Sequence, residues 1–222
     1  MHCDYRELVS RRRACTACVG LGNPSRVARG EFDYGEIGPW TGWQGRLDAE
    51  IVVVGQDFSD RQYFEKWRGQ AQPGNPTNLN LIKLLASIGV SIAPSTESSD
   101  RGAIYATNAI LCLKEGGMQA KVRTEWFANC GSRFLRPQIE LVQPRVVVGL
   151  GSQAHNAVLS AFGLPPQRLR DAVRSPGTPL LCGALAIAVY HCGAQVINIS
   201  RSFDQQLADW RRVGAALGAK AV

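Results

Sequence analysis

The chain has 222 residues, with 25 Lys and Arg against 18 Asp and Glu, which gives a formal net charge of +7 at pH 7. Hydrophobic residues make up 45% and charged residues 19%, which excludes a disordered, collagen-like or coiled-coil chain. A chain of this length can bury a core without disulfides, so we expect a single domain over residues 1–222.

The composition also bounds the location and the partners of the protein. The first six residues contain no apolar stretch typical of a signal peptide, and no run approaches the ~18 residues of a membrane span. We therefore expect a cytoplasmic protein without membrane contact. Seven cysteines, an odd number, favour thiols, a metal or a redox cofactor over disulfides. The positive charge is compatible with a nucleic-acid partner but does not establish one.

Apolar runs alternate with segments of helical periodicity along the chain. In chain order the sequence predicts a strand at 51–54, a helix at 77–88 that stops at Gly89, a strand at 104–107 and a helix at 124–142. A strand at 146–148, a helix at 152–162, a strand at 186–189 and a helix at 203–217 follow. The strands are apolar throughout rather than alternating, as in a parallel sheet covered on both faces. This pattern predicts an α/β fold, a three-layer α/β/α sandwich around a mainly parallel, four-stranded sheet.

Polar side chains follow these strands at the positions where open α/β sheets bind ligands. Gln56 and Asp57 come after the first strand and Asn108 after the second. Ser152 follows the third strand and His191 the fourth. We expect these groups to meet at one edge of the sheet.

Four cysteines form a second constellation. Cys15 and Cys18 form a CxxC motif, and Cys112 and Cys130 lie far downstream. Two close and two distant thiolates make a four-sulfur site possible for either zinc or an iron–sulfur cluster, and spacing alone does not choose between them. Three cysteines are left over, of which Cys182 fits a small buried hydrophobe: Cys3, Cys182 and Cys192.

The order of these features resembles the uracil-DNA glycosylase superfamily over residues 10–215, and within it most resembles the iron–sulfur branch, families 4 and 5. The resemblance rests on the CxxC, Gly55-Gln56-Asp57, Asn108 followed by Cys112 and Cys130, the stretch Gln-Pro-Arg-Val-Val-Val-Gly-Leu-Gly at 143–151, and Tyr190-His191. It implies a structural four-iron four-sulfur cluster on Cys15, Cys18, Cys112 and Cys130, with zinc as the alternative.

The resemblance also implies catalytic roles for a carboxylate and an imidazole. Asp57 would stabilise positive charge on the sugar and orient water, and His191 would stabilise the departing base. The Gly-Gln-Asp motif is similar to that of family 1, whereas the iron–sulfur branch usually has Gly-Glu-Ala-Pro-Gly. From the residues alone, Asp57 also fits a helix N-cap, for which Asp60 competes.

Base recognition falls to residues around the same edge. The Asn108 amide can accept from N3–H and donate to O4 of uracil, although a strand-end Asn also commonly caps a turn. Gln56, Phe58 and Ser59 would border the base. Ser59 stands where family 1 has a Tyr beside uracil C5. Either Phe58 or another ring fills that space, or discrimination against thymine is looser. Phe64 is our choice for the ring that stacks on the base, with Tyr63 and Trp67 as alternatives.

The DNA backbone would be contacted at helix starts. The amides around Thr77 and Asn78, and those at Ser152, can receive phosphates. Gln195, or Val196 instead, would act as a wedge in the duplex. We expect Lys114 to steer DNA, and the basic run Arg11–Arg13 to be a solvated face.

The leading hypothesis is a monofunctional DNA-repair glycosylase that flips uracil out of DNA and hydrolyses its N-glycosidic bond, leaving an abasic site. The partner would be uracil-containing DNA, the location nucleoid-associated and the enzyme a monomer. Alternatives are a uracil-DNA binding protein of the same fold with little turnover, a glycosylase with broader deaminated-base specificity, and a zinc-stapled nucleic-acid module.

Overall fold

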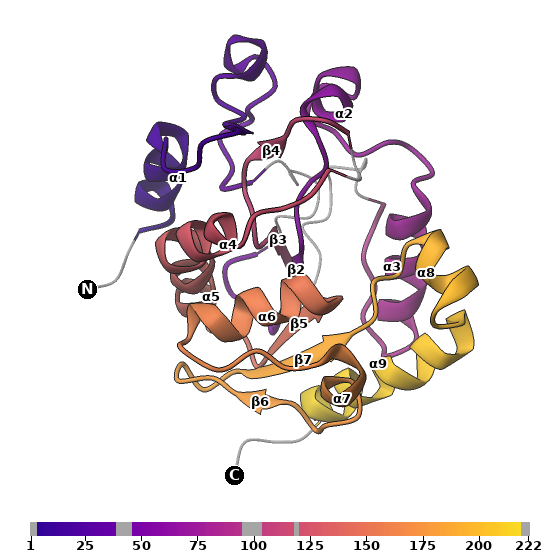
Figure 1. Ribbon diagram of the computed structural model, residues 1–222. Helices are drawn as coiled ribbons and strands as arrows, with labels where there is room; N and C mark the ends of the chain where they lie inside the picture. Colours follow the sequence, from indigo (N-terminus) through magenta and orange to yellow (C-terminus); the bar gives the residue numbers. More distant parts are fainter. Residues whose placement is uncertain (1–3, 39–45, 95–103, 118–119, 219–222) are drawn as a thin grey trace.

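A computed structural model describes residues 4–38, 46–94, 104–117 and 120–218 of the chain. Within these ranges the central sheet has five strands in the order β3-β2-β5-β7-β6 (Figure 1). The strands are β2 (Ile51–Gly55), β3 (Ile104–Asn108), β5 (Val146–Leu150), β6 (Thr178–Pro179) and β7 (Leu185–Val189).

The four long strands are parallel to one another, and β6 pairs antiparallel with β7 at the edge. The predicted parallel strands are therefore confirmed, whereas the predicted number of four is wrong. The edge strand β6 has two residues, one of which is Pro179, so it carries no apolar run that a sequence pattern could reveal.

Three of the predicted helices lie close to their predicted bounds. They are α3 (Pro76–Ala86), α6 (Ser152–Ala161) and α9 (Phe203–Gly218). The Asn75 side chain caps α3 by accepting from the backbone N–H of Thr77. The chain leaves the helical conformation at Gly89, which has φ +80°, as expected for a glycine stop.

The predicted helix at 124–142 is interrupted in the middle. It consists of α4 (Thr124–Cys130), a π-helical turn (Gly131–Leu135) and α5 (Arg136–Val142). The backbone N–H of Arg136 bonds to the carbonyl of Gly131, five residues earlier. In a regular α-helix the Pro137 ring would clash with the carbonyl of Arg133, and the wider turn accommodates it.

Several short elements escaped the sequence analysis. They are α1 (Tyr5–Ala14), a 3₁₀ helix (Val27–Gly30), α2 (Arg61–Lys66), α7 (Leu169–Ala172) and α8 (Ala194–Ile199). A separate two-stranded antiparallel sheet joins β1 (Leu21–Gly22) to β4 (Leu113–Lys114). This small sheet attaches the N-terminal segment to the loop that follows β3.

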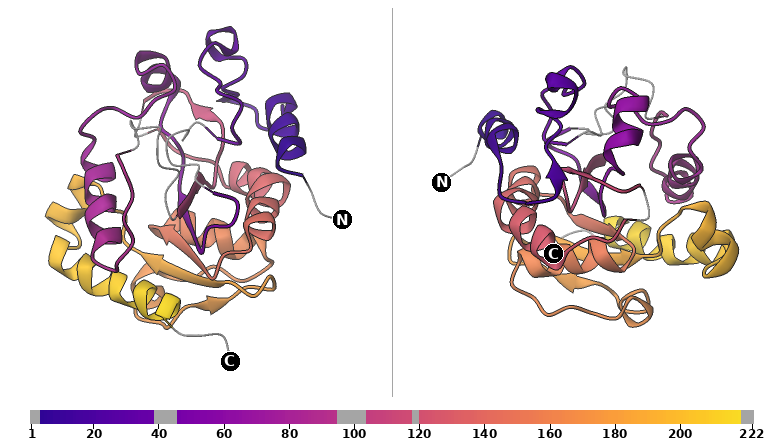
Figure 2. Two further views of the ribbon diagram at one scale, coloured as in Figure 1. Left: turned by 180° about the vertical axis from the view of Figure 1, so that it is seen from behind. Right: turned by 45° about the horizontal axis from the view of Figure 1, so that its top comes forward.

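The two faces of the central sheet bury alternate side chains of the same strands. Val52 and Val54 pack into a core shared with α1, α5 and α6. Ile51 and Val53 pack into a second core that includes Leu84 of α3 and other side chains of α3 and α9. Figures 1 and 2 show the sheet between these two groups of helices. The three-layer α/β/α sandwich is thus confirmed, and its two cores explain why the strands are apolar throughout.

None of the helices in the described ranges has the length and apolar character that crossing a membrane requires.

A tight contact between β5 and α6 yields a stability prediction. A Cβ atom at Gly149 would lie 2.6 Å from Cα of His155. We expect Gly149→Ala to lower the free energy of unfolding by about 1–3 kcal/mol, because backbone must move to admit the methyl group. The matched control is Gly218→Ala, where the new Cβ meets nothing within 4 Å. Urea unfolding compares the two variants, and equal midpoints would show that β5 and α6 are less closely packed.

Candidate functional site

A cavity of about 620 Å³ opens at the carboxyl ends of β2, β3, β5 and β7. Its volume suits a small planar ligand such as one nucleobase with its sugar. All but one of the residues predicted to act on base or DNA line it: Gln56, Asp57, Phe58, Ser59, Thr77, Asn78, Asn108, Ser152, His191 and Gln195. The parallel strands therefore bring together side chains that are up to 139 positions apart in sequence, as the strand-end rule predicts.

The carboxylate of Asp57 is held inside this cavity. Asp60, not Asp57, caps α2, because its Oδ1 accepts from the backbone N–H of Tyr63 at 2.8 Å. Asp57 Oδ2 instead accepts from Gln56 Nε2 at 2.7 Å and lies 3.2 Å from Nζ of Lys114. The N-cap alternative for Asp57 is thus excluded.

Lys114 departs from its expected role in steering DNA. Its side chain is 4% exposed and that of Asp57 is 7% exposed, so the ion pair is buried at the cavity wall. The expectation that Lys114 steers DNA is wrong, since a buried ammonium does not reach an approaching phosphate.

Asn108 presents a buried amide without a hydrogen-bonding partner in the described structure. It is the last residue of β3 and pairs with Gly55 of β2. Both Oδ1 and Nδ2 are buried, and neither has a partner there. A Cβ at position 55 would lie 2.5 Å from Asn108 Oδ1, so the glycine makes room for the amide. Because an unpaired buried amide is costly, this donor and acceptor indicate a ligand with a complementary edge.

His191 is held as a neutral imidazole. Nδ1 accepts from the backbone N–H of Gly193 at 3.1 Å, which assigns the ring proton to Nε2. Burial lowers the pKa of His191 below its ordinary value, and the Asp57 carboxylate opposes this shift only in part. A Cβ at Gly193 would lie 2.9 Å from Nδ1, so the glycine permits this contact.

Two helices hold the backbone that carries His191. Gln206 of α9 donates to the carbonyl of His191 at 3.3 Å, and Asn80 of α3 donates to the carbonyl of Cys192 at 2.9 Å. Cys192 itself is buried, and its Sγ donates to the carbonyl of Thr77 at 3.4 Å. Burial raises the pKa of the Cys192 thiol to about 12, which fits a packing role.

Ser59 lies on a strained part of the loop after β2. Its φ of +141° is rare for a residue with a side chain. The residue is buried, and its Oγ has no hydrogen-bonding partner among the described residues. Ser59 therefore borders the cavity with a small hydroxyl, as its motif position indicates.

Phe64, expected to stack on the base, lies outside the cavity. It is fully buried in a small aromatic core, with its ring centroid 6.2 Å from that of Phe58 and 6.3 Å from that of Phe32. The short helix α2 turns Phe64 into this aromatic core rather than toward the cavity. Phe58 and Tyr63 line the cavity in its place.

The helix starts differ in their free amides. At α3 the Asn75 Oδ1 already accepts from the amides of Thr77 and Asn78, which corrects the expectation that these amides receive a phosphate. At α6 the N-cap is Gly151, which has no side chain to occupy the amides near Ser152. The start of α6 therefore suits an anion better than that of α3.

The short helix α8 forms part of the cavity rim. Gln195, the predicted wedge, and its alternative Val196 both line the cavity. Ile199 on the same helix is 76% exposed, an apolar side chain that the sequence analysis did not single out. Its exposure depends on the position of α8, which no local pattern reveals.

The four predicted metal ligands line a second cavity of about 260 Å³: Cys15, Cys18, Cys112 and Cys130. In the described part of the chain, no three His, Cys, Asp or Glu residues are grouped closely enough to hold a single metal ion. The donor set is entirely sulfur, and the thiols surround a common space.

The thiols of this second cavity differ in acidity. A hydrogen bond from Cys130 lowers the pKa of Cys18 to about 6 and raises that of Cys130. The Asn129 amide supports the Cys18 thiolate by donating to Sγ at 3.5 Å. Burial raises the pKa of Cys112 to about 12. Cys18 is thus more ready to act as an anionic ligand than Cys112 or Cys130.

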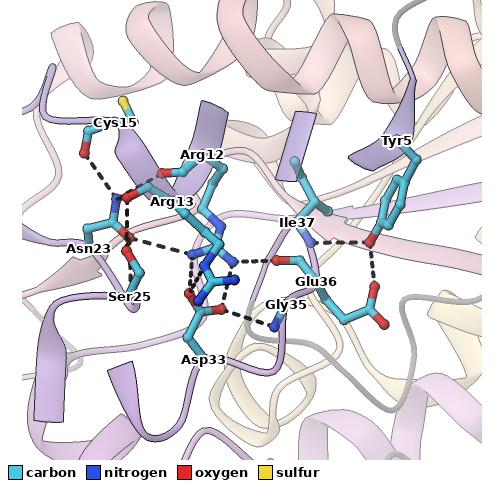
Figure 3. Close-up of polar contacts among 10 residues, drawn as sticks. All are labelled: Tyr5, Arg12, Arg13, Cys15, Asn23, Ser25, Asp33, Gly35, Glu36 and Ile37. Carbon is cyan, nitrogen blue, oxygen red and sulfur yellow. Dashed lines mark hydrogen bonds and ion pairs between the residues drawn. The ribbon is translucent and has the colours of Figure 1, made fainter. Parts of the chain in front are cut away.

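A polar network behind Cys15 fixes the CxxC segment (Figure 3). The Arg12 guanidinium binds Asp33 through both nitrogens, at 3.0 and 2.7 Å, and also donates to the carbonyl of Glu36. Asn23 Nδ2 donates to the carbonyl of Cys15 at 3.0 Å. Arg12 is 1% exposed, so the expectation that Arg11–Arg13 forms a solvated face is wrong for Arg12.

Comparison with known proteins matches residues 43–218 to the model of the uracil DNA glycosylase superfamily. The match covers more than three quarters of the chain, including the cavity residues and two of the four cysteines. The chain belongs to the uracil DNA glycosylase superfamily.

The chain is similar along its length to two proteins that are named uracil-DNA glycosylases. The chain is 29% identical over 225 aligned positions to the type-5 uracil-DNA glycosylase of Pyrobaculum aerophilum, covering 96% of this chain and 92% of that protein. It is 30% identical over 152 positions to the type-4 uracil-DNA glycosylase of Thermotoga maritima, covering 68% of this chain and 64% of that protein. The predicted resemblance to the branch of families 4 and 5 is confirmed.

Two histidines of this superfamily member predict a pH dependence of stability. Burial lowers the pKa of both His155 and His191 below the ordinary 6.5, so the unfolded chain binds protons more readily. The free energy of unfolding should therefore fall as the pH drops below about 6.5. Urea unfolding between pH 5 and pH 8 measures the slope, and His155→Asn and His191→Asn should each flatten it. A slope unchanged in both variants would contradict the assignment.

Proposed function

We propose that this protein is a uracil-DNA glycosylase, which flips uracil out of DNA and hydrolyses the bond between uracil N1 and C1′ of deoxyribose. The observation that carries the proposal is the unpaired, buried Asn108 amide in a cavity shared with Asp57 and His191. Membership of the superfamily and the names of both relatives support it.

Asn108 reads the edge of the base. Its Oδ1 accepts from N3–H of uracil and its Nδ2 donates to O4, which satisfies both unpaired atoms. Cytosine offers an acceptor at N3 and a donor at the 4-position, so it would leave the buried amide facing like groups. Gly55 leaves room for the amide at this place, because a Cβ at position 55 would collide with Asn108 Oδ1.

His191 stabilises the leaving group. As the bond to C1′ breaks, its electron pair moves onto N1 and negative charge spreads to O2 of uracil. A neutral imidazole with the proton on Nε2 donates a hydrogen bond to that oxygen. The lowered pKa keeps the ring neutral at physiological pH, so the donor does not depend on prior protonation.

Asp57 acts on the sugar and on the attacking water. Its carboxylate stabilises the positive charge that develops on the sugar and accepts the proton of the water that adds to C1′. The products are free uracil and an abasic site. The presence of both Asp57 and His191 in the cavity disfavours a binding protein with little turnover.

Other cavity residues hold the substrate. Phe58 takes the stacking role that the sequence analysis gave to Phe64, because it lines the cavity. Ser152 at the uncapped start of α6 receives a phosphate, while Thr77 and Asn78 contact DNA through their side chains. Gln195 and the exposed Ile199 are the candidates for the duplex wedge.

The four cysteines hold a structural four-iron four-sulfur cluster. The residues fit such a cluster, because it takes four cysteine ligands and four cysteines line this cavity. An all-sulfur donor set also suits zinc, and the resemblance to the iron–sulfur branch favours the cluster. When bound, the cluster ties the N-terminal CxxC to the loop after β3 and to α4.

The whole chain, residues 1–222, forms one glycosylase domain. Its N-terminal segment lies before the matched region but pairs with it, because β1 bonds to β4. The Asn129 contact with Cys18 is a second link between the same parts.

Excision assays test the proposed roles directly. Asp57→Asn, Asn108→Ala and His191→Ala should each lower the single-turnover rate on uracil-containing oligonucleotides by about 10²–10⁴-fold, because each removes a group that acts on the reacting bond or holds the base in place. Asp204→Asn, on the exposed side of α9, is the matched control and should keep the wild-type rate. Wild-type rates in all three variants would refute the site.

Colour and metal content test the cluster. The purified protein should be brown, with about four irons and four sulfides per chain. Cys15→Ala and Cys130→Ala should lose iron and colour, whereas Cys182→Ala, whose thiol lies outside the cavity, should keep both. A colourless wild-type protein that carries one zinc would overturn the assignment.

A further inference from the structure

Lys114 brings to the cavity a buried charge that the reaction described above does not use. Its Nζ lies 3.2 Å from Asp57 Oδ2, and both side chains are nearly inaccessible to water. Burying an ammonium is costly, and a buried ion pair can often be replaced by apolar side chains without loss of stability. The pair is therefore poorly explained as a stabilising element.

The backbone around Lys114 points this side chain at Asp57. Because successive side chains of a strand face opposite ways, Leu113 enters the aromatic core beside Phe58 and Lys114 faces the cavity. The strand is held on both sides, by pairing with Leu21 of β1 and by a bridge to Asp60 in the loop after β2. The ammonium thus approaches Asp57 from a firmly held element.

Two donors converge on one oxygen of the carboxylate. Gln56 Nε2 donates to Oδ2 at 2.7 Å, and Nζ of Lys114 lies 3.2 Å from the same atom. The carboxylate oxygen nearest to Nζ of Lys114 is thus the same oxygen to which Gln56 donates. Anchoring one oxygen from two directions fixes the rotation of the carboxylate and so determines where the other oxygen lies.

We propose that Lys114 is a positioning residue for the glycosylase reaction: with Gln56 it anchors Oδ2 of Asp57, so that Oδ1 receives the attacking water. The inference rests on the proposed function. Lys114 itself touches neither uracil nor DNA. Its ammonium also offsets the charge of Asp57, which makes orientation of water the main task of this carboxylate and stabilisation of the sugar cation the lesser one.

The geometry separates this role from a contact with DNA. A lysine that binds phosphate would act on substrate affinity and would be exposed. A positioning lysine acts on the chemical step through Asp57, since misplacing a reacting group by about 1 Å can cost on the order of 10²-fold in rate.

A double-mutant cycle under single-turnover conditions tests the proposal. Lys114→Met should lower the maximal rate of uracil excision by about 10–100-fold and change the half-saturating concentration less than about threefold. Lys114→Arg, which keeps the charge and the donors, should recover most of the rate. In the Asp57→Asn background, Lys114→Met should change the remaining rate less than about threefold, because the carboxylate it anchors is gone. Lys83→Met, at an exposed position on α3, is the control and should match wild type.

The same cycle guards against a trivial loss of fold. Lys114→Met removes the ion-pair partner of a buried carboxylate, which then keeps only the hydrogen bond from Gln56 among the described residues. The double variant with Asp57→Asn has no such buried charge, so thermal unfolding of all variants shows which of them are folded. The proposal would be overturned if Lys114→Met lowered the excision rate by the same factor in the wild-type and Asp57→Asn backgrounds. It would also be overturned if Lys114→Met changed only the half-saturating concentration and left the maximal rate unchanged. A wild-type protein that excises no uracil would instead refute the proposed function, which distinguishes the two failures.

Discussion

The parallel pairing of β3, β2, β5 and β7 is the constraint on which the site depends. Its register sets Gly55 beside Asn108 and Leu150 beside Val189, so the loops after all four strands begin at the same level. A one-residue shift would turn each strand-end side chain to the other face of the sheet. Two separate apolar cores specify that register from both faces, because each strand contributes alternate side chains to each core. The reacting groups are therefore positioned mainly by valines and isoleucines that are buried in these two cores.

Local patterns predicted what depends on local order. Continuous apolar runs such as Ile51–Val54 revealed the parallel strands, and the strand-end rule then placed Asp57, Asn108 and His191 around one cavity. The interruption of the helix at 124–142 was not predicted, although Pro137 is a local signal for it.

Patterns failed where a long-range contact decides the outcome. The pairing of Lys114 with Asp57 spans 57 positions, and the burial of Phe64 depends on rings elsewhere in the chain. Arg12 looked like a solvated basic residue because its partner Asp33 is 21 positions away. In each case the sequence shows the side chain but not the partner that takes it out of water.

The two cavities share a structural element. β4 begins one residue after Cys112 and ends at Lys114, so the wall of the sulfur-lined cavity continues into the wall of the base cavity. The other strand of this small sheet, β1, follows the CxxC motif. Asn23 and Arg12 hold the backbone of this motif in place through hydrogen bonds to Cys15. The N-terminal segment is thus more than an appendage: its pairing with β4 supports the residue that anchors Asp57.

The short strand β6 affects how the molecule meets other proteins. An open sheet exposes unpaired amides at its edge, and such edges can recruit strands from other chains. Here the edge beside β7 is covered by two residues, and Pro179 has no amide hydrogen to offer. A strand from another chain could pair with only two residues of β6, and one of these lacks a backbone N–H. The element that a sequence pattern could not reveal therefore covers β7 at Leu185 and Ala186 and offers another chain little backbone with which to pair.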